Sequence, residues 1–239
     1  MYQATPFIGS GEIYINGRDV GNASDFTIQA PKIDTKDMKS MRRDSYGTIV
    51  KSVPISFSQS LKFTLTDINK DNLILAMYGE GSVISQTSGA ADDEVVAVTK
   101  GRWSPLAHRK VKSSPAVVVT NSDGTTTYVH GTDYDIDYDA GRILAIESGA
   151  IANGNIKVDY SYDAYTGYKV DANKQQIIEA EVRFVGRDIA MSRAVEVVVY
   201  EASIQPSSEV DLLSTDFIKL GFTGDILSTA SGTWTMTVI

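Results

Sequence analysis

The stretch from Ile55 to Gly79 changes its hydrophobic period halfway along, and this change limits the folds that the chain can adopt. In its first half, apolar and polar residues alternate. The apolar positions are Ile55, Phe57, Leu61, Phe63 and Leu65, with Gln59 as the one polar residue among them. A period of two is typical of a strand with one buried side and one solvent-facing side. The sequence therefore predicts one long strand over residues 55–66.

A short helix is predicted directly after this strand. Apolar residues from Ile68 to Met77 recur at helical spacing, and Asp67 or Asn69 offers a side-chain oxygen to the helix N-terminus. Gly79 stands at the C′ position, where a glycine commonly ends a helix. The polar side of the preceding strand holds no nucleophile–base pair and no metal-ligand cluster, so it is interpreted as a surface and not as an active site.

Three further segments alternate in the same way, over residues 24–30, 176–185 and 194–204. Together with the first strand they give four long strands, each with an apolar face for a core and a polar face for solvent. In the last of them the alternation places Tyr200, Ala202 and Ile204 inward. Near the N-terminus, the Asn16-Gly17 pair after a short strand predicts a tight hairpin turn.

The rest of the chain sets the domain organisation. Residues 31–54 lose all periodicity and carry charges of both signs, which predicts a long loop, either solvated or ordered against a neighbouring copy. Residues 79–94 are small and acidic, as in a linker, and residues 95–165 hold short β-rich runs between turns such as Asp123-Gly124. The predicted fold is mainly β: a β-sandwich with one short helix and an inserted small all-β module. The expected domains are residues 1–90, 91–165 and 166–239.

Composition excludes several classes of protein. The 239 residues carry a net charge of −8, which argues against tight binding to phosphate backbones but allows a surface that nucleic acid slides past. The absence of cysteine excludes disulfides and thiolate chemistry, and it fits assembly in a reducing cytoplasm. No apolar run approaches the roughly 18 residues of a membrane span. The first twenty residues also lack the features of a secretion signal.

Candidate chemistry is weak. Carboxylates at alternate positions, Asp133, Asp135, Asp137 and Asp139, suggest a calcium loop, but no register supplies the Gly and Glu that an EF-hand needs. The alternative is a strand with an acidic solvent face. His108 and His130 stand in no recognisable catalytic pattern. We therefore expect no catalytic residues, no metal, no cofactor and no enzymatic activity.

Two interpretations of the four polar faces stay open. They are the outer surface of an ordinary sandwich, or they line a curved sheet that joins copies of itself into a ring and so removes its exposed edges. In the second case the inner wall is small, polar and mildly acidic. It would consist of Asp25, Thr27, Gln29, Ser56, Ser58, Ser60, Lys62, Thr64, Glu179, Glu181, Arg183, Glu201 and Ser203.

The chain resembles the major tail tube proteins of long-tailed bacteriophages. The similar stretches are IYINGRDVGNASDFTI, LKFTLTDINKDNLILAMYG and VVVYEASIQPSSEVDLLSTDFIKLGFTGDIL. The segment from Ala116 to Ala164 looks like the immunoglobulin-like module that some of these proteins carry. The resemblance implies hexameric rings that stack into a tube, with four strands per subunit in a closed inner β-barrel through which the genome is ejected.

The resemblance also implies particular contacts. Residues 31–54 correspond to the loop that stacks one ring on the next, with Lys36, Lys39, Arg42, Arg43, Asp44 and Tyr46 as its candidate residues. The implied partners are other copies of the chain and the tape measure, tail tip and terminator proteins. Duplex DNA is a transient, non-specific passenger, and no membrane is involved. The implied location is the virion tail, after assembly in the cytoplasm of the host bacterium.

An acidic or neutral lumen is physically reasonable because it repels phosphates. Lys62 and Arg183 are exceptions: either they pair with Glu179 or Glu181, or the predicted register is wrong by one residue. The alternative function is a carbohydrate- or receptor-binding β-sandwich on a virion surface. That function needs an exposed aromatic cluster, for which the candidates are Tyr134, Tyr138, Tyr160, Tyr162, Tyr165 and Tyr168.

Overall fold

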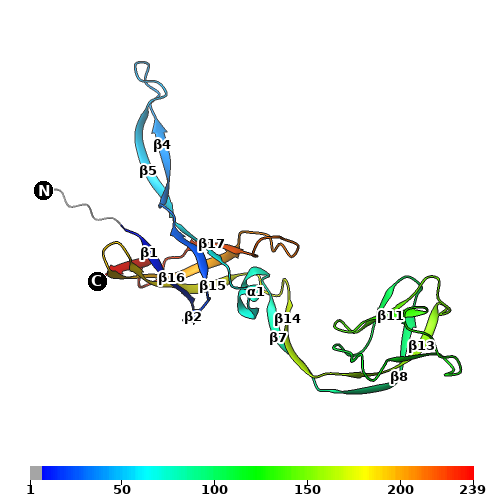
Figure 1. Cartoon of the computed structure of the whole chain (residues 1–239). Coiled ribbons are helices and arrows are strands. Elements are labelled where there is room, and N and C mark those ends of the chain that lie inside the picture. The colour runs from blue at the N-terminus through cyan, green and yellow to red at the C-terminus, as the bar shows by residue number, and fades with distance from the viewer. Residues whose placement is uncertain (1–6) are drawn as a thin grey trace. The chain divides into compact units, whose positions relative to one another are not determined.

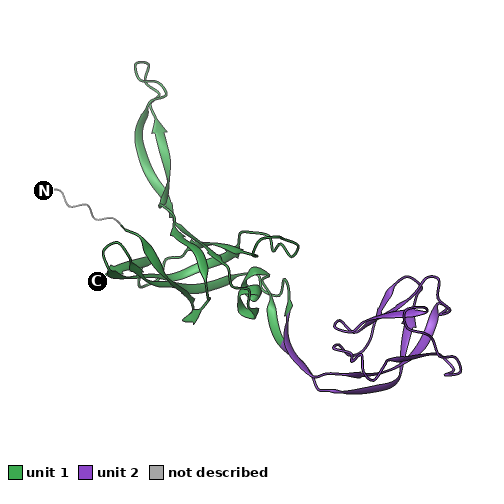
Figure 2. Cartoon of the chain, in the orientation of Figure 1, with its two compact units in different colours: residues 1–82, 170–239 green, residues 83–169 purple. Residues whose placement is uncertain are grey.

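A computed structural model describes residues 7–239, and the chain divides into two compact units. The first unit contains residues 7–82 and 170–239 of the described chain, and the second contains residues 83–169 (Figure 2). The structure is mainly β, as predicted, with a single helix among the described residues. In the same range, no helix has the length and apolar composition needed to cross a membrane.

One large antiparallel sheet is the main part of the first unit (Figure 1). Its strand order is β2-β1-β15-β16-β17-β6-β3, and β18 also pairs with β16. The strands are β1 (Gly9–Ile15), β2 (Arg18–Asp19), β3 (Ala23–Ile28), β6 (Ser60–Leu65), β15 (Ile178–Asp188), β16 (Arg193–Pro206), β17 (Leu220–Ile226) and β18 (Trp234–Val238). The predicted Asn16-Gly17 turn joins β1 to β2, with positive φ at both residues.

The sheet folds over on itself because the long strand β16 pairs with two different strands along one edge. Its first half, Val195–Val199, pairs with β18, and its second half, Ala202–Pro206, pairs with β17. The sheet curls so that β3 approaches β15, and the Phe26 ring stacks on Phe184 with centroids 5.6 Å apart. A two-layered arrangement therefore arises from one continuous sheet.

The core of the first unit confirms the alternation predicted for the second half of residues 55–66. Leu61, Phe63 and Leu65 are fully buried, and the Phe63 ring stacks on Phe222 of β17 at 5.1 Å. Val182 and Val199 bury the facing side of β15 and β16. Burial of a Leu or Phe side chain stabilises the folded state by about 1.5–3 kcal/mol, so this layer holds the sheet together.

A β-bulge in β16 corrects one predicted orientation. The pairing of β15 with β16 shifts register so that Tyr200 and Glu201 together lie opposite Glu181. An extra residue in one strand changes which side chains face inward beyond it. Val199 is consequently buried, and Tyr200 is half-buried outside the core cluster, with its hydroxyl 3.4 Å from Thr235 Oγ1. The inward placement predicted for Tyr200 is wrong.

The helix α1 (Lys70–Ala76) follows β6 as predicted. Its N-cap is Asn69, whose side-chain oxygen accepts a hydrogen bond from the Asn72 amide at 2.9 Å. The C-terminal prediction is wrong by one residue, because Tyr78 and not Gly79 has the left-handed conformation, with φ of 47°. The Gly79 amide instead donates to the Ile74 carbonyl, which completes a Schellman motif.

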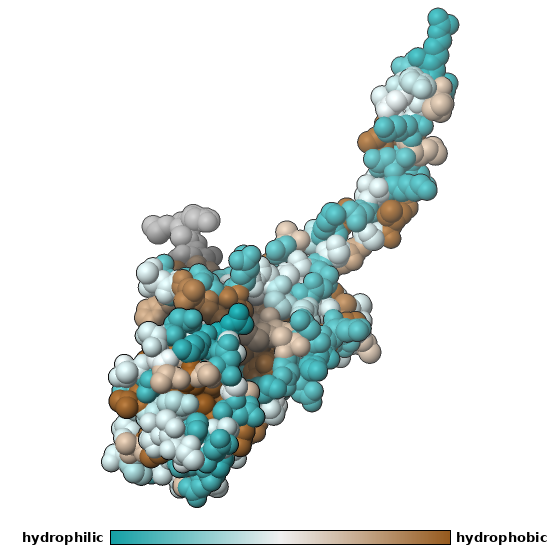
Figure 3. All heavy atoms as spheres, turned by 90° about the vertical axis from the view of Figure 1, so that its right-hand side faces the viewer, coloured by the Kyte–Doolittle hydropathy of each residue, from teal (hydrophilic) through white to brown (hydrophobic). Residues whose placement is uncertain are grey.

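Residues 31–54 are not a loop. They form most of a β-hairpin, β4 (Lys32–Lys39) and β5 (Ile49–Ser58), which stands away from the large sheet in Figure 1. Every residue of both strands is exposed, and Figure 3 shows hydrophobic residues interspersed with hydrophilic ones along it. Because neither face of the hairpin is covered, its sequence needs no alternation, and the periodicity test missed it.

The predicted strand over residues 55–66 is therefore interrupted at Gln59. Ile55 and Phe57 were predicted to be buried, but they are 66% and 60% exposed. Gln59 is fixed at the interruption by two hydrogen bonds. Its side chain donates to the Gln29 carbonyl and accepts from the Trp234 indole N–H, both at 2.9 Å. The hairpin β4–β5 continues the pair β3–β6 beyond this point, without a second layer in the described chain.

The second unit has two three-stranded antiparallel sheets around one core. Their orders are β10-β13-β8 and β11-β12-β9. The strands are β8 (Gly89–Val98), β9 (Trp103–Pro105), β10 (Val118–Asn121), β11 (Tyr134–Asp137), β12 (Arg142–Ala145) and β13 (Gly154–Tyr162). Val119, Ile143 and Val158 are fully buried between the sheets. The Asp123-Gly124 turn lies where it was predicted, with Gly124 at φ of 71°.

Residues 79–94 are not an unstructured linker. They include β7 (Glu80–Gln86), which pairs with β14 (Tyr165–Asp171), and the beginning of β8. The chain divides at residues 82 and 169, whereas the domain boundaries expected from the sequence were 90 and 165. That the second unit is an inserted immunoglobulin-like module stays a prediction.

Candidate functional site

The face of the large sheet opposite its core is a continuous polar surface. Directly paired residues of antiparallel strands share a face, so the register defines the rows on this surface. One row runs across β15, β16, β17 and β6 as Glu179, Ser203, Asp225 and Ser60. A second row runs across β3, β6, β17 and β16 as Thr27, Lys62, Thr223 and Gln205. We call this surface the polar face.

The register brings together most of the residues predicted to line an inner wall. Asp25 pairs with Thr64 in a third row, and Glu181, Arg183 and Glu201 lie around the bulge of β15 and β16. Gln29 follows β3, where its side-chain oxygen accepts a hydrogen bond from Ser60 Oγ at 3.1 Å. Segments far apart in the sequence therefore supply one surface.

Ser56 and Ser58 are not on the polar face. Both belong to β5 in the hairpin, where Ser58 pairs with Lys32 and the Ser56 hydroxyl donates to Asp34 Oδ2 at 3.0 Å. They were assigned to the wall because residues 55–66 were predicted as one strand. The interruption at Gln59 separates them from Ser60, Lys62 and Thr64.

The strand β17 contributes Thr223 and Asp225, which the sequence analysis did not assign to the wall. It lies between β16 and β6, so the four predicted strands are not all neighbours. Leu220 and Phe222 are buried, whereas Thr223 is partly exposed and Asp225 is exposed. Alternation in LGFTGDI is weakened by Gly221 and Gly224, which explains why this strand was missed.

The polar face is net negative. Over β3, β6, β17, residues 179–183 of β15 and residues 196–205 of β16, it carries the carboxylates Asp25, Glu179, Glu181, Glu196, Glu201 and Asp225 against the cations Lys62 and Arg183. Arg183 is paired: its guanidinium is 3.1 Å from Glu181 Oε1 and 2.8 Å from Glu196 Oε1. The hydrogen bond to Glu181, followed by that to Glu196, raises the pKa of Arg183. Lys62 lies between Thr27 and Thr223 on the adjacent strands.

The six residues predicted for a stacking loop lie on the hairpin. Lys36 and Lys39 belong to β4, and the other four occupy the turn before β5. The turn is closed by the Ser40 hydroxyl, 2.9 Å from Ser45 Oγ, and Arg42 lies 3.9 Å from Asp44. Large apolar side chains are exposed on the same hairpin, namely Ile33, Met38, Met41, Ile49, Val50, Val53, Ile55 and Phe57. The hairpin therefore presents apolar surface as well as charge.

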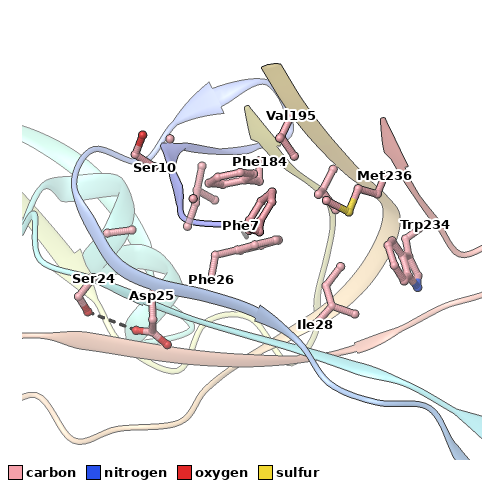
Figure 4. Close-up of a pocket in the computed structure, with 15 residues that line it drawn as sticks. Phe7, Ser10, Ser24, Asp25, Phe26, Ile28, Phe184, Val195, Trp234 and Met236 are labelled. Carbon is pink, nitrogen blue, oxygen red and sulfur yellow. Dashed lines mark hydrogen bonds between the residues drawn. The ribbon is translucent and has the colours of Figure 1, made fainter. Parts of the chain in front are cut away.

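An apolar pocket of about 460 Å³ lies between β3 and the strands β1, β15, β16 and β18 (Figure 4). Figure 4 shows Phe7, Phe26 and Phe184 gathered together, with Trp234 and Met236 beside them. Phe7 and Met236 are about half exposed, so the pocket reaches the surface. We call it the sandwich pocket. It was not predicted, since its lining residues meet only after the sheet has curled.

The four alternate aspartates of the second unit do not form a calcium site. Each has its own partner in the protein: Asp133 accepts from the Val129 and Ala150 amides, Asp135 contacts His130, and Asp137 and Asp139 pair with Arg142 and Lys110. The amide of Ala150, followed by that of Val129, lowers the pKa of Asp133. Across residues 7–239, no group of three or more acidic or histidine side chains is arranged to hold a metal ion.

The tyrosines of the second unit are not gathered on one exposed surface. Tyr134 and Tyr160 belong to the core, and their hydroxyls donate to the Val117 carbonyl and to the Glu94 carboxylate. Burial is the main reason that the pKa of Tyr160 is raised. The Tyr162 ring stacks on His108 with centroids 3.8 Å apart. The aromatic cluster required by the binding-module alternative is therefore largely used for packing.

The fold and the polar face together define a mainly β protein with an exposed, acidic sheet surface. The chain belongs to the family described as "Protein of unknown function UCP028589", which matches residues 6–234. It is also similar to the tail sheath protein of Burkholderia phage BcepMu, with 33% identity over 103 residues. That match covers 40% of this chain and 21% of the sheath protein, so the chain spans about a fifth of the length of this relative.

Proposed function

We propose that this chain is a structural protein of a bacteriophage tail, and specifically the subunit of the tail tube. In this proposal hexameric rings stack into a hollow tube, and the genome passes through the tube into the host. The observation that carries the proposal is the polar face, a sheet surface of small polar and acidic side chains built from five strands. The similarity to a phage tail sheath protein supports the tail assignment.

The polar face has the properties that a DNA conduit requires. Four more carboxylates than cations lie on it, so it repels phosphates at the short distances of a narrow lumen. Lys62 is flanked by Thr27 and Thr223, and Arg183 is held in ion pairs, which limits the sites where DNA would adhere. The proposed lining is the wall set of the sequence analysis without Ser56 and Ser58, and with Thr223 and Asp225 added.

Open sheet edges support the formation of rings. The order of the large sheet ends at β2 and β3, each of which has one strand neighbour among residues 7–239. Unpaired strand edges invite pairing with further strands, and closing a sheet into a barrel removes them. A head-to-tail arrangement of six copies would close the inner barrel in this way.

The hairpin β4–β5 is the proposed contact between rings. A two-stranded hairpin alone in water is at best marginally stable, and this one exposes eight large apolar side chains. Packing against the adjacent ring would cover Ile55 and Phe57 and would bring Arg42, Arg43 and Asp44 to charged partners. This assigns the stacking role to Lys36, Lys39, Arg42, Arg43, Asp44 and Tyr46 together with the apolar residues.

The remaining parts of the proposal concern partners and location. The tube would end at tail tip and terminator proteins and would enclose a tape measure protein during assembly in the host cytoplasm. The role is structural, with DNA as a transient passenger and without an enzymatic step. A second unit on such a tube would be a decoration or contact module.

Negative-stain electron microscopy of the concentrated full chain tests the proposal. We expect rings or tubes with six-fold symmetry and a lumen of at least about 20 Å, wide enough for duplex DNA. Since an initiator protein can be required, the same sample is also mixed with a tail tip complex. Persistent monomers under both conditions would contradict the tube assignment.

Charge reversal on the polar face tests the lumen assignment separately. Tubes of the double variant Glu179→Lys and Asp225→Lys are expected to retain duplex DNA at about 50 mM salt and to release it as salt rises. The control is Asp92→Lys with Asp123→Lys, which changes the net charge equally in the second unit. Equal DNA retention by both variants would show that the polar face does not line the lumen.

A further inference from the structure

Two apolar features of the first unit have no partner within the described chain. One is the sandwich pocket, and the other is the loop of residues 207–219 between β16 and β17. Leu212, Leu213 and Phe217 of this loop are 75%, 97% and 92% exposed. Scattered apolar residues are normal on a surface, but three nearly bare large side chains within six residues indicate a contact site.

The loop is shaped by local hydrogen bonds that leave these side chains free. The Leu213 amide donates to Asp211 Oδ1 at 3.0 Å, and the Asp216 amide donates to Ser214 Oγ at 3.1 Å. At its base, the Ser207 amide donates to the Gly221 carbonyl at 2.8 Å. The backbone is thus held in the first unit while the apolar side chains point into solvent. We call these three residues the apolar knob.

The sandwich pocket matches the apolar knob in size and chemistry. Its lining is mainly aromatic and aliphatic, with Phe26, Phe184 and Trp234 as the largest side chains. An apolar cavity of about 150 Å³ holds one benzene molecule, so a pocket of about 460 Å³ has room for one phenyl ring and two leucine side chains. The polar atoms at its rim, Ser10, Ser24 and Asp25, would remain near solvent.

In the described chain the apolar knob does not occupy this pocket, since Leu212, Leu213 and Phe217 are exposed and none of them lines it. Val195 and Val197 of β16 line the pocket, and the loop begins after Pro206 at the other end of the same strand. Nine residue steps, roughly 30 Å, separate Val197 from Pro206. On the other side of the pocket, Ala23 pairs with Leu65, which pairs with Leu220 directly after the loop.

We propose that the apolar knob of one copy fills the sandwich pocket of the next copy. Because knob and pocket are different surfaces, the contact between copies is heterologous and repeats from copy to copy. Such a contact generates a ring when the rotation closes. The inference rests on the proposed function in that it names the lateral contact of the ring, but it makes its own prediction about which residues meet.

Cysteine cross-linking tests the contact directly, since the chain contains no cysteine of its own. Leu213→Cys places a thiol on the knob, and Met236→Cys places one on the half-exposed lip of the pocket. Oxidation of the double variant is expected to give a ladder of covalent oligomers on non-reducing gels. An equal mixture of the two single variants is expected to give mainly mixed dimers. The control pair is Met236→Cys with Val129→Cys, an exposed position in the second unit, which should give no ladder.

The outcomes separate this contact from the tube assignment. A ladder without rings or tubes in the electron microscope would support the knob contact and contradict the tube. Rings without a ladder would overturn the knob contact and leave the tube standing. A cross-link confined to the monomer would also overturn the knob contact. So would an internal cross-link between Tyr2→Cys and Met236→Cys, because it would show that the chain's own N-terminal residues occupy the pocket.

A substitution provides a second measurement that does not depend on cross-linking. Leu213→Asp changes a side chain that is almost fully exposed, so the fold should persist. Loss of one buried leucine from the contact is expected to weaken self-association about 10- to 100-fold in sedimentation or mass photometry. Val129→Asp is the matched control and should leave association unchanged. Unchanged association of Leu213→Asp would overturn the proposal.

Discussion

The two halves of residues 55–66 have the same alternating pattern, but their apolar side chains are exposed in the first half and buried in the second. In β6, Leu61 and Phe63 are fully buried, whereas in β5, Ile55 and Phe57 are more than half exposed. The difference arises because β6 lies between β3 and β17 under a second layer, while β5 pairs only with β4. Alternation thus shows that a strand has two chemically different sides, but it does not show whether the layer that covers the apolar side belongs to the same chain.

This comparison gives a physical meaning to the exposed apolar residues. In β6 the apolar side stabilises the folded monomer, and in β5 it is available to stabilise an assembly. Substitutions in the two strands should therefore affect different measurements.

Phe63→Ala should have the largest effect, a loss of about 3–5 kcal/mol in the free energy of unfolding, because it leaves a cavity beside Phe222. Urea unfolding, followed by the fluorescence of Trp234 in a Trp103→Phe background, measures the first unit. Phe63→Leu is a control that keeps most of the volume and should cost less. A loss below about 1 kcal/mol for Phe63→Ala would show that the β6 layer is not the core of this unit.

Low pH should have the next largest effect, because it destabilises the end of the large sheet that contains Asp188. Asp188 is fully buried beside Arg193, and the guanidinium contact is the main reason that the pKa of Asp188 is lowered. A carboxylate with a lowered folded pKa stabilises the protein above its unfolded pKa of about 3.9, and this contribution is lost as pH falls through the folded pKa. As pH falls from about 5 to about 2, the thermal unfolding midpoint should therefore decrease more steeply for the wild type than for Asp188→Asn. Identical pH profiles would remove Asp188 as the cause.

The matching ion pair of the hairpin should matter far less. Asp34 lies 3.3 Å from Lys32 on β4, where both side chains are at least half exposed. Solvent and salt screen such pairs, so Asp34→Asn should leave the unfolding midpoint of the monomer nearly unchanged. A destabilisation comparable to that of Asp188→Asn would indicate that the hairpin is covered within the monomer.

Phe57→Ala should have the smallest effect on the monomer and a clear effect on the assembly. Because Phe57 makes no core contact, the substitution should change the free energy of unfolding of the monomer by less than about 0.5 kcal/mol. If the hairpin packs on the adjacent ring, the concentration needed for tube growth should rise by tenfold or more. Turbidity and electron microscopy measure this growth. Normal tubes from Phe57→Ala would separate the hairpin from ring stacking.

Some features followed from local sequence alone, because their physical causes act over a few residues. The Asn16-Gly17 turn, the Asn69 cap and the buried side of Leu61, Phe63 and Leu65 are of this kind. Turn residues need particular φ values, and an N-cap needs a side-chain oxygen that accepts from the backbone amide three residues later. Alternation follows from strand geometry. The mainly β class was predictable for the same reason.

Other features were decided by the tertiary structure, because they depend on what lies beside a segment. The bulge at Tyr200 and Glu201 reverses an orientation that the alternation had predicted, and β17, a strand that the alternation did not identify, lies between β16 and β6. The exposure of β5 and the sandwich pocket likewise depend on the path of the whole sheet. The sequence by itself determined that this protein has strands with one polar side, and only the curled sheet decided which of those sides form one surface, since register and layer contacts are made between distant residues.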